Sequence, residues 1–206
     1  MRTRSVTLAI ILTSGVTFVI GSPVCLWAKY KNDVAGDAPD AWRPALVQGL
    51  RVGEATREEV LARLGEPDRI ESYSAEQTGG NPIEWLIYEK PIESRFPGYA
   101  IVWIDGQTGR LTEVTITPQK LSRDRLLEEL GTAFQMTRYS FCTDLDDGEA
   151  APIYEDPSGS LEYMEFRDLG ISVLFDWRGD VQQLRFLSVS FGITREECLS
   201  AKRDAE

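Results

Sequence analysis

The same order of helix and strand signals occurs twice in the 206-residue sequence, and this repetition constrains the fold more than any other feature. Gly131 lies 66 residues after Gly65, and each glycine follows a short apolar stripe at helical spacing. The hairpin signals that come later are offset by 70–71 residues, from Asp105 to Asp176 and from Gly109 to Gly179. A period of this length suits a duplicated unit rather than a solenoid. The stripes are Val60, Leu61 and Leu64, then Leu126, Leu127 and Leu130.

Each stripe carries the end signals of a short helix. Thr56 is a good N-cap residue, and Glu59 stands three positions later as the second half of a capping box. Gly65 supplies a C-terminal turn, and Pro67 prevents the helix from continuing. Ser122 opens the second copy in the same way. The sequence therefore predicts two short helices.

Three strands follow each helix, because short apolar and aromatic runs alternate with turn residues. We predict an α+β fold made of two tandem helix-plus-antiparallel-strands units, a duplicated α+βββ arrangement, with the helices on one face of the sheet. The alternative is that two segments share only generic patterning. The predicted strands are Glu84–Tyr88, Tyr99–Asp105, Leu111–Ile116, Leu161–Phe166, Ile171–Asp176 and Val181–Leu187.

The N-terminal segment has the pattern of an export signal. Arg2 and Arg4 precede an uncharged run over residues 5–28, which at about 1.5 Å per residue is long enough to cross a bilayer. Cleaved signal peptide and retained anchor stay open, and lipidation of Cys25 is a third possibility. We expect the remainder to face the exterior or periplasm. The expected organisation is 1–28 signal or anchor, 29–48 linker, 49–118 first unit, 119–192 second unit and 193–206 C-terminal tail.

Cysteine usage agrees with export. Apart from Cys25, the chain contains Cys142 and Cys198, an even number for an oxidising compartment. We predict a disulfide between these two residues that holds the tail in place. The alternative is that both are buried, unpaired thiols.

Composition excludes several function classes. The chain has no histidine, so a Ser-His-Asp or Cys-His catalytic arrangement and a histidine-based metal site are ruled out. Its net charge of −11 makes nucleic acid a poor partner. We expect no cofactor and no metal, and we interpret the acidic segment 143–159 as a solvated loop rather than a calcium site. Asp105 and Asp176 could form a catalytic carboxylate pair, although both are better explained as turn residues.

Aromatic residues are the best candidates for a binding surface. In an antiparallel sheet with helices on one face, the other face exposes some side chains, and exposed aromatic residues there are typical of protein-binding surfaces. The alternative is that each of them belongs to the core. The candidate binding residues are Trp103, Trp177, Trp85 and Tyr163.

Residues 53–67, GEATREEVLARLGEP, resemble the opening helix of the SmpA/OmlA family of small bacterial envelope lipoproteins. The tandem arrangement resembles that of β-lactamase inhibitor protein. The first resemblance implies a location in the bacterial cell envelope and a role in assisting outer-membrane barrel assembly. The second implies inhibition of an exported partner.

Three functions follow as hypotheses. The leading one is a non-enzymatic envelope protein that binds another protein through its sheet face, in an assembly or scaffold role, with membrane attachment through the N-terminal segment. The second is an inhibitor or immunity-like protein, for which an acidic surface suits a basic partner. The third is a carboxylate-dependent hydrolase using Asp105 and Asp176.

Overall fold

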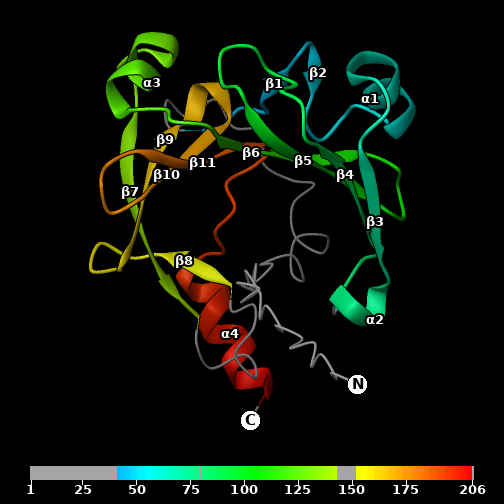
Figure 1. Ribbon diagram of the computed structural model, residues 1–206. Coiled ribbons are helices and arrows are strands. Elements are labelled where there is room, and N and C mark those ends of the chain that lie inside the picture. Colours follow the sequence, from blue (N-terminus) through cyan, green and yellow to red (C-terminus); the bar gives the residue numbers. More distant parts are fainter. Residues whose placement is uncertain (1–40, 79, 143–151, 206) are drawn as a thin grey trace, which may run out of the picture.

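A nine-stranded antiparallel sheet dominates the computed structural model, which describes residues 41–78, 80–142 and 152–205 (Figure 1). Its strand order is β3-β4-β5-β6-β11-β10-β9-β7-β8, and a separate hairpin pairs β1 with β2. The bounds are β1 Leu46–Val47, β2 Leu50–Arg51, β3 Arg69–Tyr73, β4 Ile83–Tyr88, β5 Gly98–Asp105, β6 Leu111–Pro118, β7 Gln135–Phe141, β8 Ile153–Glu155, β9 Leu161–Phe166, β10 Ile171–Phe175 and β11 Val181–Leu187.

The two predicted helices are present. They are α1, Arg57–Leu64, and α3, Arg123–Leu130. Thr56 and Glu59 form the capping box at the start of α1, with the Thr56 amide donating to the Glu59 carboxylate over 2.8 Å. Ser122 caps α3 in the predicted way. The other helical segments are α2, Ala75–Thr78, a 3₁₀ turn at Arg167–Leu169, and α4, Arg195–Ala205.

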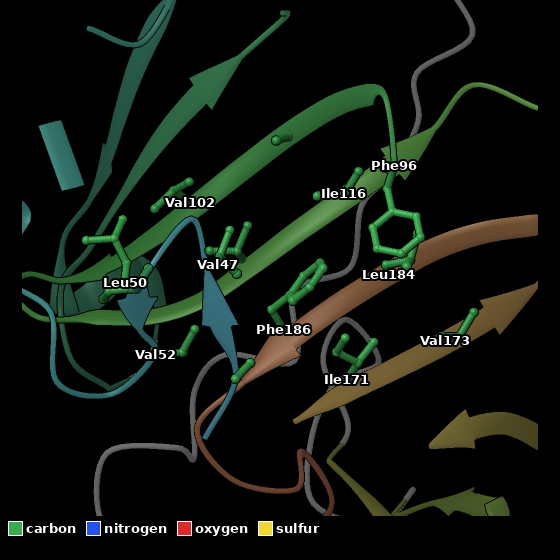
Figure 2. Packing of buried hydrophobic residues seen from close by; sticks show 14 of the residues in the cluster. Val47, Leu50, Val52, Phe96, Val102, Ile116, Ile171, Val173, Leu184 and Phe186 are labelled. Atoms are coloured by element: carbon green, nitrogen blue, oxygen red, sulfur yellow. The ribbon is translucent and has the colours of Figure 1, made fainter. Parts of the chain in front are cut away.

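The main core lies between one face of the sheet and the elements that cover it. Val60 of α1 and Leu126 of α3 are fully buried there. Val47, Leu50 and Val52 of the β1–β2 hairpin pack against side chains from the central strands (Figure 2). This face therefore owes its stability to apolar burial. A second, smaller buried cluster, which includes Tyr139, Tyr163 and Leu187, covers part of the opposite face.

The prediction of a duplicated α+βββ fold is wrong. Strand β6 pairs directly with β11, with Ile116 opposite Leu184, so the strands belong to one continuous sheet rather than to two units. The helices do not share one face either. Helices α1 and α3 lie on one side of the sheet with the β1–β2 hairpin, whereas α4 lies on the other side (Figure 1).

The error has a physical reason. Strands β3, β7 and β8 were not predicted, because none of them contains a continuous apolar run. Residues of β3 alternate between exposed and half-buried, and β7 buries only Thr137 and Tyr139. Such strands form because a neighbouring strand provides hydrogen-bond partners for their backbone. This effect depends on the tertiary structure and cannot be predicted from the residues of the strand alone.

The predicted disulfide between Cys142 and Cys198 is confirmed. The two Cα atoms are 5.9 Å apart, and both residues are buried. The bridge attaches α4 to the end of β7. The amide of Cys142 also donates to the carbonyl of Pro152, next to β8, so a backbone hydrogen bond joins the attachment point to the neighbouring strand.

Two sequence predictions fall outside the residues that the structure describes. The signal or anchor over 1–28 lies there entirely, and so does most of the acidic loop within 143–159. Within the described ranges, no helix is long and apolar enough to cross a membrane.

Replacing Thr56 with Ala is expected to lower the free energy of unfolding by about 1 kcal/mol, because the capping box satisfies amides that α1 leaves unpaired. Chemical denaturation followed by circular dichroism measures this loss. The matched control is Thr132→Ala, an exposed threonine directly after Gly131. An equal loss in both variants would contradict a specific capping contribution.

Candidate protein-binding face

The sheet face opposite α1 and α3, here called the far face, carries an unusual set of side chains. Cross-strand partners in an antiparallel sheet point to the same side, so the register assigns residues to this face. Trp85 lies opposite Trp103, and Trp103 lies opposite Glu113. Thr115 lies opposite Arg185 on the same face. Aromatic side chains thus gather at the β3 side, with charged groups at the centre.

Three aromatic side chains form a continuous row across strands β3, β4 and β5. The ring centroids of Tyr73 and Trp85 are 4.6 Å apart, and those of Trp85 and Trp103 are 4.8 Å apart. The rings are tilted by 55° and 60°, so each packs an edge against its neighbour. All three residues are half-buried. This aromatic row therefore combines a fixed geometry with partly exposed apolar surface.

The aromatic row contains unused hydrogen-bond donors. The indole Nε1 atoms of Trp85 and Trp103 are buried and have no acceptor among the described residues. A buried donor without an acceptor costs about 1–3 kcal/mol. Tyr73 is satisfied differently, because its hydroxyl donates to Glu71 over 2.7 Å. Burial, reinforced by this carboxylate, raises the pKa of Tyr73 to about 12, so the hydroxyl stays protonated at neutral pH.

A buried ion pair lies beside the aromatic row. The Arg185 guanidinium donates two bonds to the Glu113 carboxylate, each 2.7 Å long, and Thr115 donates a third at the same length. The Arg185 guanidinium also lies 4.5 Å from the ring centroid of Phe191. Burial opposes the charge on Arg185, but the Glu113 carboxylate outweighs it and raises the pKa of Arg185. The pair fixes the centre of the far face.

A second polar cluster surrounds Glu165, which is fully buried. Its carboxylate accepts bonds from Tyr139, from Thr137 at 2.8 Å and from Arg167 at 3.0 Å. Burial is the main reason that the pKa of Tyr139 is raised, and the adjacent Glu165 charge adds to it. Sequence reasoning missed both polar clusters. The available signal was a charged residue between apolar residues of β6, β9 and β11, namely Glu113, Glu165 and Arg185.

The four candidate binding residues do not lie together. Trp85 and Trp103 are adjacent in the aromatic row. Trp177 is 86% exposed in the turn between β10 and β11, where the Arg178 guanidinium lies 4.5 Å from its ring centroid. Tyr163 is buried and packs edge-on against Tyr139 and Phe191. The structure therefore groups two of the four candidates and separates the others.

The suggested carboxylate pair does not form. Three antiparallel pairings lead from β5 to β10, so these two strands run in opposite directions. Their C-terminal residues therefore lie at opposite ends of the strands. Asp105 accepts bonds from the amides of the next turn, and Asp176 does the same in its own turn. Both residues act as turn residues. Within the described part of the chain, no group of three cysteine or acidic residues could hold a metal ion.

Comparisons with known proteins give little further guidance. No family model matches the chain, and no curated protein does. A solved structure, a cysteine-rich secretory protein (SAV1118) from Staphylococcus aureus subsp. aureus Mu50, is similar with a TM-score of 0.41 and 14% sequence identity. The similarity covers 77% of this chain and 48% of that protein, so the chain spans about half the length of that protein.

Proposed function

We propose that this chain is a non-enzymatic protein of the bacterial cell envelope that binds another protein through its far face. The observation that supports the proposal most is the aromatic row of Tyr73, Trp85 and Trp103. Tryptophan and tyrosine contribute disproportionately to protein-binding energy when they lie on a preorganised surface. The envelope location rests on the N-terminal sequence pattern and on the disulfide, which suits an oxidising compartment.

The accessible part of the aromatic row is ring surface. The Nε1 atoms of Trp85 and Trp103 are buried, so a partner would contact the partly exposed rings rather than these donors. The tilted rings leave no flat platform, which favours irregular protein surface over a planar ligand. An assembly or scaffold role follows if the partner is a resident envelope protein.

Site-specific photo-crosslinking tests this proposal without removing the aromatic row. A photoreactive phenylalanine derivative at Tyr73 would keep a ring on the far face, whereas the same group at Ile70 would lie three residues away on the opposite face of the same strand. Ile70 is 44% exposed, so both positions are accessible. We expect one discrete protein adduct in intact cells from position 73 and none from position 70.

Two further results are required. The adduct should disappear when an excess of the unlabelled chain is produced in the same cells and competes for the partner. It should also weaken when Trp103→Leu is introduced, whereas Trp177→Leu, at the distant β10–β11 turn, should leave it unchanged. Equal labelling from positions 70 and 73, or an adduct indifferent to Trp103→Leu, would count against binding through the far face.

A further inference from the structure

A pocket lies away from the aromatic row, where the segment after β11 passes over β7 and β8. Its volume is about 410 Å³, within the usual range for small-molecule sites. The amide of Ile193 donates to the carbonyl of Ile153 over 2.8 Å, which fixes this wall to β8. The lining residues are Trp42, Tyr139, Glu155, Arg167, Ser190, Gly192, Ile193, Thr194 and Arg195.

The apolar wall of the pocket is held in a fixed position. The indole of Trp42 donates to the carbonyl of Leu187 over 3.4 Å, so its polar atom is already bonded and its ring remains available for packing. Tyr139 likewise donates its hydroxyl to buried Glu165. A Cβ at position 192 would lie 2.7 Å from Cε1 of Tyr139, so glycine allows the wall to approach that ring.

Two guanidinium groups line the same pocket. Arg167 is held from behind by Glu165, through a 3.0 Å bond from Nε, and its Nη2 atom lies 3.9 Å from Glu155. No bond within the described residues occupies its Nη1 atom. Arg195 makes no ion pair within 4.0 Å in the described ranges, although hydrogen bonds from Ser158 and, to a lesser extent, the Arg195 charge lower the pKa of Asp156. The nearby Glu197 carboxylate is engaged by the amide of Thr194. The pocket thus offers Nη1 of Arg167 and the guanidinium of Arg195 beside apolar rings, with Glu155 as its acidic lining residue.

From these features we infer that the pocket binds a small organic carboxylate with an apolar body. The carboxylate would take bonds from Arg195 and from the free donors of Arg167, since guanidinium groups match carboxylate geometry. The apolar body would pack against Trp42 and Ile193. The volume limits the ligand to a small molecule. The register places Tyr139 on the same side of the sheet as Arg185, so the pocket shares the far face with the aromatic row but lies over β7 and β8, at the other end of the sheet.

Calorimetry on the full chain tests the inference with N-acetylphenylalanine and its uncharged amide as probes. We expect the acid to bind at least about tenfold more tightly than the amide, because only the acid forms charge-assisted bonds. Arg195→Gln should remove most of this preference. Arg178→Gln, at the β10–β11 turn and outside the pocket, is the matched control and should retain it.

The possible results are decisive. Arg195 makes no ion pair in the described chain, so Arg195→Gln should unfold at the same temperature as the parent and any change in binding reflects the site. Absence of acid binding at concentrations up to about 10 mM would overturn the inference. Equal binding of acid and amide would overturn it, as would a preference for the acid that survives Arg195→Gln or is lost in Arg178→Gln.

Discussion

Replacing Glu113 with Gln is expected to lower the free energy of unfolding by about 3–5 kcal/mol. The substitution preserves shape but leaves the Arg185 charge without its counter-ion in a site where the two side chains are only 10% and 11% exposed. Breaking one partner of a buried pair costs more than the pair contributes, because the remaining ion stays desolvated. Urea unfolding monitored by tryptophan fluorescence measures the change.

The matched control is an exposed ion pair in the same sheet. Arg138 and Glu162 lie 3.0 Å apart with side chains 53% and 47% exposed, so Glu162→Gln should cost less than about 1 kcal/mol. The double variant Glu113→Leu with Arg185→Met should recover much of the loss, since it removes both charges. A cost for Glu113→Gln as small as the control would show that water reaches the pair.

Removing the disulfide with Cys142→Ala and Cys198→Ala is expected to lower the free energy of unfolding by about 4 kcal/mol. The two cysteines are 56 residues apart, and the loss follows from the freedom that the unfolded chain regains over this loop. Alanine avoids placing a hydroxyl in a site where both residues are buried. Thermal unfolding of the two proteins under the same conditions measures the difference.

Reduction provides an independent check on the disulfide result. The parent chain in strong reductant should approach the stability of the double alanine variant, whereas the variant should not respond to reductant. The exposed Leu199, adjacent to Cys198, supplies a local control: Leu199→Ala should have little effect. A loss below about 1 kcal/mol in the double variant would contradict a stabilising role for the bridge.

Helices and apolar strands could be predicted from the sequence, because their signals are local. The capping box at Thr56 and the runs that became β4, β5 and β9 each contain enough apolar spacing or turn chemistry to specify an element. Strands β3 and β7 were missed, because their own residues carry no strand pattern. They form by backbone pairing with β4 and β9. The prediction of two tandem units was wrong because strand pairing between distant segments, such as β6 with β11, joins them into one sheet.

The candidate site was predictable only in part. The sequence placed Trp85 and Trp103 on strands, but their contact depends on the register between β4 and β5, which local patterns do not define. Glu113 and Arg185 are 72 residues apart, so nothing near either residue indicates the other. Trp177 illustrates the opposite case: it was expected to be exposed and is 86% exposed, but it lies in the β10–β11 turn rather than on the sheet face.

The position of Cys198 after every strand of the sheet has a consequence for biosynthesis. A chain made from its N-terminus presents every strand of the described residues, and Cys142 with them, before the second bridge cysteine exists. Until then, the only other cysteine available to Cys142 within the chain is Cys25. The bridge therefore closes on a sheet whose strands have all been synthesised. Formation of the disulfide therefore attaches α4 after the strands have been made, and it does not direct how they pair.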